Sequence, residues 1–190
     1  MTLEIITEPL NEPLSTADAK AHGRQEDGTI EDALIASYVK SARRRVETYL
    51  RRKLINQTLR LSLSCFPSQI VLPMDPVSAV TSLTYLDPAG VRQTMAPENY
   101  RLVRAHGGSL VVPVRNGSWP VTLTDYASVQ VDFTAGYGAD VTSIPEDILQ
   151  AVRLLVAHYA EHREAVVVGT GATDLPEGVV SHLAPYRRWI

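Results

Sequence analysis

Residues 145–164, PEDILQAVRLLVAHYAEHRE, carry the strongest structural signal in the chain. Apolar side chains recur there at three- and four-residue spacing, which places them on one face of an α-helix: Ile148, Leu149, Val152, Leu155, Val156 and Tyr159. Pro145 suits the first turn of this helix, where its missing N–H is not needed for a hydrogen bond. The helix cannot bury its own apolar face, so another element must cover it.

A second amphipathic helix is predicted over residues 29–52. Thr29, followed three residues later by Asp32, is typical of a helix N-cap. Apolar side chains again follow helical spacing: Leu34, Ile35, Tyr38, Ala42, Val46 and Tyr49. Shorter helices are predicted over residues 15–21, with Ser15 as N-cap, and over residues 178–188. We expect the two long helices to pack together.

Between the long helices the apolar period changes to two. Leu59, Leu61, Leu63 and Cys65 alternate with polar residues, as in a half-buried strand, and Cys65 is interpreted as a small core residue. The turn at residues 87–90, DPAG, is typical of a hairpin. Further strands are predicted over residues 69–72, 80–86, 91–95, 100–103, 110–112, 121–124 and 129–134.

The predicted fold class is therefore α+β. The expected architecture is a small helical bundle, made of two long helices and short terminal helices, with an antiparallel β segment inserted over residues 55–138. We expect a single domain spanning residues 1–190.

Composition narrows the possible functions. The chain has 190 residues and a formal net charge of -3, which argues against a protein whose main task is to bind DNA phosphates. The first residues lack a basic segment followed by a long apolar run, and no stretch approaches the ~20 apolar residues of a membrane span. We expect a soluble protein without an export signal or membrane contact.

The segment His158-Tyr159-Ala160-Glu161-His162 matches the H-x-x-E-H pattern of a class of zinc hydrolases. Two histidines four residues apart on a helix can share a zinc ion, and Glu161 can act as the base. The third ligand would have to come from Glu164, Glu177 or a distant acid. We therefore interpret the histidines as residues at a surface or subunit interface, and predict no catalytic residue, metal or other cofactor. The zinc hydrolase is the alternative hypothesis.

Glycines at 169 and 171 do not form a phosphate loop, because the third glycine and the Lys-Ser/Thr ending of such loops are absent. Residues 166–174 are interpreted as a flexible loop.

The second half of the helix at 29–52 is basic. Cations near a helix C-terminus on a solvated face explain this, and so does a patch for an acidic neighbouring subunit or for DNA. We expect five exposed charges on the two long helices to contact neighbouring copies of the chain: Arg43, Arg44, Arg51, Glu161 and Glu164.

The chain ends in aromatic residues and arginines, the types enriched at interface hot spots: Tyr186, Arg187, Arg188 and Trp189. The preceding segment is too short to form a stable helix alone, so it is expected to be mobile in the free protein and to order when a partner binds. In the alternative, the segment folds back and covers the helix at 145–164 with Val179, Leu183 and Tyr186.

Eight short segments follow one another in a specific order over nearly the whole chain: PLSTADAKAH at 13–22, EDALI at 31–35, LINQT at 54–58, VTSLTYLD at 80–87, DFTAGYG at 132–138, IP at 144–145, HYAEHRE at 158–164 and LAPYR at 183–187. Together they resemble the head-tail connector (adaptor) proteins of tailed bacteriophages and of phage-derived gene transfer particles. The resemblance also accounts for the H-x-x-E-H match, because that helix position in such proteins commonly carries an aromatic residue and Arg-Glu without a metal.

The resemblance implies a structural, non-enzymatic protein of a virion or phage-like particle, located at the head-tail junction and assembled in the bacterial cytoplasm. Such proteins form a ring, commonly twelvefold, that joins the portal to the neck and tail. The implied partners are the portal protein, neighbouring copies of the chain, a neck or tail-completion protein, and DNA that passes through the lumen without sequence-specific binding. We expect Tyr186, Arg187, Arg188 and Trp189 to bind the portal. A tail-completion or tail-terminator ring is the alternative within the structural class.

Overall fold

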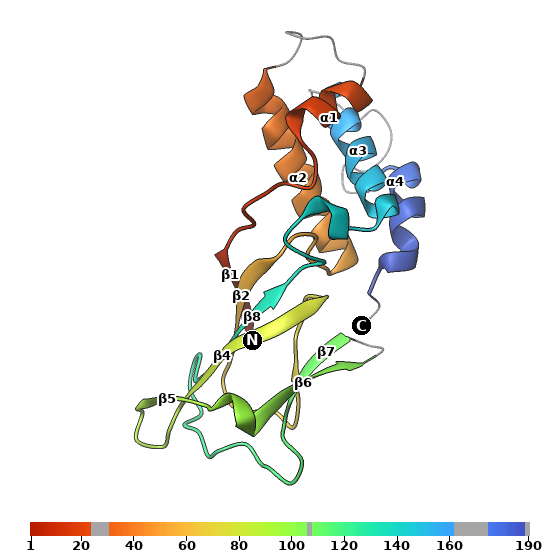
Figure 1. Cartoon of the computed structure of the whole chain (residues 1–190). Helices are drawn as coiled ribbons and strands as arrows, with labels where there is room; N and C mark the ends of the chain where they lie inside the picture. Colours follow the sequence, from red (N-terminus) through yellow and green to blue (C-terminus); the bar gives the residue numbers. More distant parts are fainter. Residues whose placement is uncertain (24–30, 106–107, 162–174, 189–190) are drawn as a thin grey trace. The chain divides into compact units, whose positions relative to one another are not determined.

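The computed structural model describes residues 1–23, 31–105, 108–161 and 175–188. The chain divides into two compact units (Figure 1). The unit that we call the sheet unit comprises residues 1–9, 51–137 and 188–190, and the helical unit comprises residues 10–50 and 138–187. The prediction that residues 1–190 form a single domain stays a prediction.

In its described residues, the helical unit has four α-helices. They are α1 (Thr16–His22), α2 (Asp32–Leu50), α3 (Glu146–Glu161) and α4 (Glu177–Leu183), with short 3-10 turns η2 (Val141–Ser143) and η3 (Ala184–Tyr186). The hydroxyl of Ser15 accepts a hydrogen bond from the Asp18 N–H at 3.0 Å, so Ser15 is the N-cap of α1 as the sequence predicts. The expected N-cap of α2, Thr29, lies outside the described residues.

The core of the helical unit follows the helical period of the sequence. Helices α2 and α3 pack together, and α4 packs on α3. Their buried apolar residues are Ile35, Val39, Ala42, Val46 and Leu50 on α2, Ile148, Leu149, Ala151, Val152, Leu155, Val156 and Ala160 on α3, and Val179 and Leu183 on α4. The expected packing of the two long helices is confirmed.

The sheet unit contains two antiparallel sheets. One has five strands in the order β1-β2-β8-β4-β5: β1 (Thr2–Thr7), β2 (Gln57–Leu63), β8 (Val129–Ala135), β4 (Val77–Leu86) and β5 (Arg92–Thr94). The other has three strands in the order β3-β7-β6: β3 (Ile70–Val71), β7 (Gly108–Pro113) and β6 (Tyr100–Ala105). A 3-10 turn, η1 (Pro97–Asn99), precedes β6.

Strand β8 lies in the middle of the larger sheet, and its side chains alternate strictly. Val129, Val131, Phe133 and Ala135 are buried, whereas the residues between them are partly exposed. Neighbouring strands continue the buried layer, because Leu61 of β2 and Leu83 of β4 both pair with Val131. The two-residue period of the sequence therefore reports the side of the sheet that faces the core.

The end of β8 depends on one glycine. Gly136 has a φ of 150°, and a Cβ atom there would lie 2.4 Å from the backbone nitrogen of Asn56. Its own N–H donates to the Pro76 carbonyl at 2.9 Å. Only glycine allows the backbone segments to approach this closely.

The predicted helical bundle with an inserted β segment is wrong. The structure has two antiparallel sheets and about equal helix and strand content. Residues 2–7 form β1, which pairs with β2, so the larger sheet begins before the first helix. The sheet unit also has a hydrophobic core of its own. The prediction failed because β1 is a short edge strand whose pairing with β2 is not visible in its own sequence.

Two local predictions in the sheet unit are also wrong. Cys65 is exposed, because β2 ends at Leu63 and the alternating pattern continues past the strand. Residues 121–124 form no strand. They instead follow β4 irregularly, with the Leu123 N–H donating to the Leu86 carbonyl at 3.1 Å and the Thr122 hydroxyl donating to the same oxygen at 2.6 Å.

Candidate assembly surfaces

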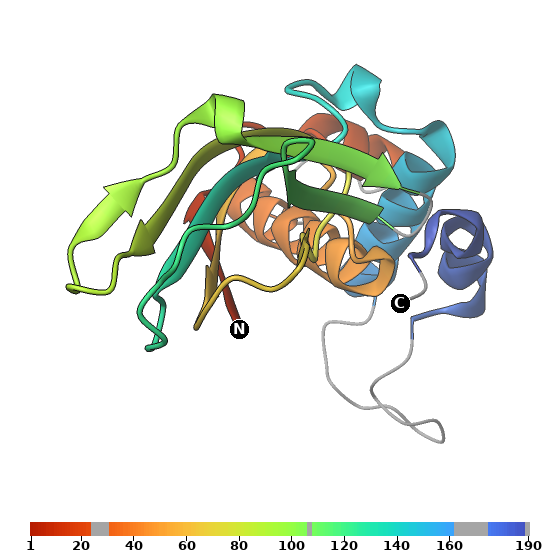
Figure 2. The same cartoon turned by 90° about the horizontal axis from the view of Figure 1, so that it is seen from below.

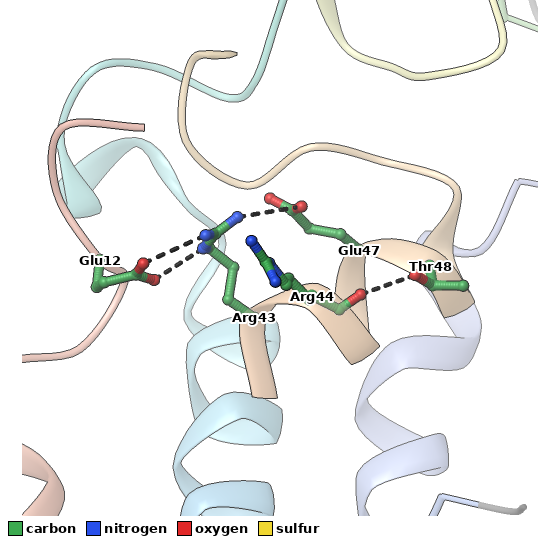
Figure 3. Close-up of polar contacts among 5 residues, drawn as sticks. All are labelled: Glu12, Arg43, Arg44, Glu47 and Thr48. Carbon is green, nitrogen blue, oxygen red and sulfur yellow. Dashed lines mark hydrogen bonds and ion pairs between the residues drawn. The ribbon is translucent and has the colours of Figure 1, made fainter. Parts of the chain in front are cut away.

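Arg43 is a buried charge in the helical unit, with 0% of its surface exposed. Its Nε donates to Oε2 of Glu12 at 2.7 Å, and its Nη2 donates to Oε1 of the same carboxylate at 3.2 Å. Its Nη1 donates to Oε2 of Glu47 at 3.4 Å. Figure 3 shows the two carboxylates converging on the guanidinium from the segment before α1 and from α2 itself. This contact ties two segments together through a bidentate, charge-assisted pair.

The expected exposure of Arg43 is therefore wrong. Arg43 lies four residues after Val39 and three before Val46, on the face of α2 that faces the core. The sequence contained a usable signal, because Glu47 follows Arg43 at i+4, the spacing of an ion pair on one helix face. Its stronger partner, Glu12, could not be found from local spacing.

The other expected contacts between copies lie at the surface where they are described. Arg44 and Glu161 are exposed, and the Arg44 carbonyl accepts a hydrogen bond from the Thr48 hydroxyl at 2.8 Å. Arg51 is also exposed and follows the end of α2 with a positive φ of 53°. Glu164 lies outside the described residues. The role of these residues in contacts between copies stays a prediction.

The described part of the C-terminal segment packs on its own unit. Val179 and Leu183 are 1% and 0% exposed. The Tyr186 hydroxyl donates to Oδ2 of Asp147, in the first turn of α3, at 3.1 Å. The guanidinium carbon of Arg187 lies 4.7 Å from the centre of the Tyr49 ring, which is a cation–π contact. This is the arrangement that the fold-back alternative expects.

The hydrogen bond from Tyr186 has an electrostatic consequence. The Asp147 carboxylate accepts the phenol proton and so favours the neutral phenol, which raises the pKa of Tyr186 above its usual value of 10.0.

Arg188 is the buried arginine of the sheet unit. Its Nη1 lies 2.7 Å from Oδ2 of Asp75 and donates to the Leu72 carbonyl at 2.8 Å. The other oxygen of Asp75 accepts hydrogen bonds from the Ser109 N–H at 3.1 Å and the Ser109 hydroxyl at 2.6 Å. A Cβ atom at Gly108 would lie 2.0 Å from Nη2 of Arg188, so a glycine there leaves space for the guanidinium.

Arg188 was expected to project toward the portal, and its observed place inside the sheet unit corrects that expectation. Arg188 can be buried there because the Asp75 carboxylate pairs with its charge. The sequence did not predict this pair, because Asp75 lies 113 positions earlier in the chain and local spacing carries no sign of it. Trp189, the other outermost residue of the predicted set, lies outside the described residues.

The H-x-x-E-H segment begins on α3. His158 and Glu161 line a pocket of about 310 Å³ in the helical unit, together with Leu154, Pro176 and Val179. His162 lies outside the described residues. In the part of the chain that the structure describes, no three His, Cys, Asp or Glu side chains gather as a possible metal site. No helix within the described ranges has the length and apolar character needed to cross a membrane.

The family model of head completion proteins matches residues 14–189 of the chain. The chain belongs to the head completion protein family. Membership confirms the resemblance to head-tail adaptor proteins and the structural role that the resemblance implies.

Solved structures of known particles contain similar chains. A chain of the virion of a native gene transfer agent (GTA) particle is 31% identical with a TM-score of 0.82. A chain in the neck of the empty GTA particle, computed with C6 symmetry, has the same identity and TM-score, and one in the neck of the native particle, computed with C12 symmetry, is 31% identical with a TM-score of 0.79. Each match covers 100% of this chain and 97% of the other. No curated protein matches the chain.

These matches confirm the predicted location at the head-tail junction of a phage-like particle.

Proposed function

We propose that this head completion protein forms a closed ring of twelve copies in the neck of a phage-like particle, where it joins the portal to the tail and lets DNA pass through the lumen. The observation that carries the proposal is the similarity over the whole chain to a protein in a neck with C12 symmetry. The proposed role is structural and includes no catalytic step. A net charge of -3 fits a chain that lets DNA pass without gripping its phosphates.

Identical chains close a ring only if each presents two different, complementary surfaces. Four of the predicted contact residues supply opposite signs, and three of them, Arg44, Arg51 and Glu161, are exposed. Arg44 and Arg51 are the cations, and Glu161 and Glu164 are the anions. Arg43 has no part in this contact, because its guanidinium already binds Glu12 and Glu47 inside the helical unit.

The C-terminal segment is the proposed portal-binding element. Tyr186 and Arg187 are half-buried, so each keeps surface that can meet a partner, and Trp189 follows them in sequence. Arg188 contributes by holding its own backbone in the sheet unit rather than by contacting the portal. Aromatic rings and arginine forks of this kind suit a partner that offers an apolar groove and carboxylates. A neck or tail-completion protein is the proposed partner on the other side of the ring.

The ring is tested by counting copies in purified particles with quantitative mass spectrometry. About twelve copies per particle are expected from the C12 symmetry of the matched neck. A single copy per particle would contradict the ring.

The helix charges are tested by the double variant Arg44→Glu/Arg51→Glu in a strain that lacks the wild-type gene. Both residues are exposed, so we expect an unchanged melting temperature and a loss of heads joined to tails. Arg101→Glu, an exposed charge reversal on β6, is the matched control and should assemble normally. Normal assembly of the double variant would remove these residues from the ring contact.

Portal binding is tested with Arg187→Glu and with a chain that ends at Arg188. Purified portal-bearing heads should retain the wild-type protein and lose both variants, while the circular dichroism melt stays close to wild type. Ser181→Glu, on the exposed side of α4, is the control and should still bind. Full retention of both variants by the heads would rule out this segment as the portal contact.

A further inference from the structure

Among the residues that the structure describes, the larger sheet ends in two edge strands, β1 and β5, at opposite ends of the strand order. In Figure 2, β1 is red and β5 is light green. Three strands separate them, which corresponds to roughly 19 Å between the edges at the usual strand spacing. The outer backbone groups of an edge strand are free to pair with another strand, so proteins usually protect such edges.

Edge strand β1 is poorly protected. Ile5 is 44% exposed and Ile6 is 47% exposed, and the regular pairing with β2 shifts by one residue between Ile5 and Thr7. The register places Ile5 opposite Leu59 of β2, which belongs to the core, so Ile5 lies on the core side of the sheet. Glu4 pairs with Arg60 and therefore lies on the other side.

A pocket lies beside the opposite edge. It has a volume of about 430 Å³, within the usual range of small binding pockets, and its apolar wall contains Met95, Val114, Trp119 and Pro120. Trp119 is held in place by stacking on Phe66, with 4.8 Å between the ring centres. Tyr85 also lines the pocket, and it pairs with Val129 of the core. Tyr85 and the core residue Met95 therefore place part of the pocket wall on the core side of the sheet, the side on which Ile5 lies.

The charges at the two edges are complementary and share the other side of the sheet. Arg92 of β5 pairs with Leu86, one residue from Tyr85, so Arg92 lies on the side opposite to the pocket. Its guanidinium donates to the Thr84 hydroxyl and the Ala127 carbonyl, both at 3.2 Å, and both acceptors are neutral. Glu4 lies on this same side at the β1 edge, next to Arg60, whose guanidinium is bound by Asp132 at 2.7 Å.

We propose that β1 of one copy adds to the β5 edge of the next copy, placing Ile5 in the pocket beside Trp119 and Glu4 beside Arg92. The alternation of side chains makes both contacts compatible, because a strand that continues the sheet keeps Ile5 on the pocket side and Glu4 on the Arg92 side. The inference rests on the proposed ring and assigns the sheet unit a contact in it.

A second copy fits these edges better than a different partner. A ring needs two complementary surfaces on each copy, and one sheet carries both here. The two surfaces match in side-chain polarity and in charge. The similar chain from the neck with C12 symmetry aligns with this whole chain, so residues 1–9 are included.

Charge exchange tests the contact. Glu4→Arg and Arg92→Glu each place like charges together, and we expect each to lower the yield of tailed particles about tenfold. The double variant Glu4→Arg/Arg92→Glu should restore the yield, because each copy then offers the reversed pair to its neighbour. Rescue cannot arise within one copy, since the two residues lie at opposite edges of its sheet. A double variant as defective as the single variants, with wild-type melting curves for all three, would overturn the proposal.

Cross-linking tests the partner directly. The exposed Cys65 is first replaced in Cys65→Ser, and Ile5→Cys is combined with Ser118→Cys at the pocket. Treatment of assembled particles with a short bismaleimide should give a ladder of multiples of this chain, whereas Ile5→Cys or Ser118→Cys alone should give none.

Two other results of the cross-linking overturn the proposal. Particles that hold the normal number of copies but give no ladder would overturn the strand contact and leave the ring intact. A cross-link to a protein of another mass would show that a different partner occupies the edge. Failure of the ring itself is recognised separately, by a copy number of one per particle.

Discussion

The helical unit and the sheet unit each bury an arginine, but the two arginines are held differently. Arg43 lies within a long helix and faces two carboxylates, Glu12 and Glu47. Arg188 lies near the chain end and binds the Asp75 carboxylate and the Leu72 backbone carbonyl. Asp75 also accepts two hydrogen bonds from Ser109, which would remain if Arg188 were removed. Loss of the buried cation should therefore lower the free energy of unfolding more at Arg43 than at Arg188.

A buried charge without any partner should have the largest effect. Val131→Asp places a carboxylate in the centre of the sheet unit, where the native side chain is 0% exposed. We expect a loss of about 4 kcal/mol or more in the free energy of unfolding, enough to prevent folding of a marginally stable domain. Soluble yield and thermal melting measure it, and Leu61→Asp should behave alike.

Gln130→Asp, on the other side of the same strand, is the control and should fold. A wild-type melting temperature for Val131→Asp would show that the assigned faces of β8 are reversed.

Arg43→Ala should have the next largest effect. It leaves the Glu47 side chain, which is 2% exposed, and Glu12 without their shared cation, and we expect a loss of about 3 kcal/mol measured by urea unfolding. The neighbouring exposed variant Arg44→Ala should change stability by about 0.5 kcal/mol or less.

The double variant Arg43→Met/Glu47→Leu should recover much of the loss, because both charges of the helix pair are then removed together. Equal effects of Arg43→Ala and Arg44→Ala would show that Arg43 is not buried.

Arg188→Ala should cost less than Arg43→Ala, about 2 kcal/mol, because Asp75 keeps its hydrogen bonds from Ser109. Urea unfolding of both variants under the same conditions measures the difference. Ser109→Ala in the Arg188→Ala background should increase the loss further. A larger loss of stability for Arg188→Ala than for Arg43→Ala would contradict the idea that the hydrogen bonds from Ser109 to Asp75 limit the loss.

The smallest effect concerns pH. The pKa of Tyr186 is raised by its hydrogen bond to Asp147, so the folded state binds this proton more tightly than the unfolded state. The resulting stabilisation is fully present below the ordinary pKa of 10.0 and is lost as pH rises through the higher folded pKa. The stability difference between wild type and Tyr186→Phe should therefore shrink in alkaline solution.

Tyr126→Phe is the control for this measurement, because its ring is 77% exposed. A stability difference between wild type and Tyr186→Phe that does not depend on pH would contradict the hydrogen bond.

Much of the fold was predictable, because the buried side chains of a helix or strand recur at a regular spacing in the sequence. The stripe of α3 and the alternation along β8 each report which side of an element faces a core. Capping by Ser15 is equally local, since donor and acceptor lie three residues apart. The family was also predictable, since its weak motifs follow one another in order along one chain.

By itself, the sequence determined the long helices, most strands of the sheet unit and the family. Only the tertiary structure decided that β1 completes a sheet, that Cys65 is exposed, and that Arg43 is buried while Arg44 is not. The reason is that periodicity belongs to one element, whereas an ion pair or a strand pair depends on two segments. The partners of Arg43 and Arg188 lie 31 and 116 positions away at Glu12 and Leu72, beyond the reach of any local pattern.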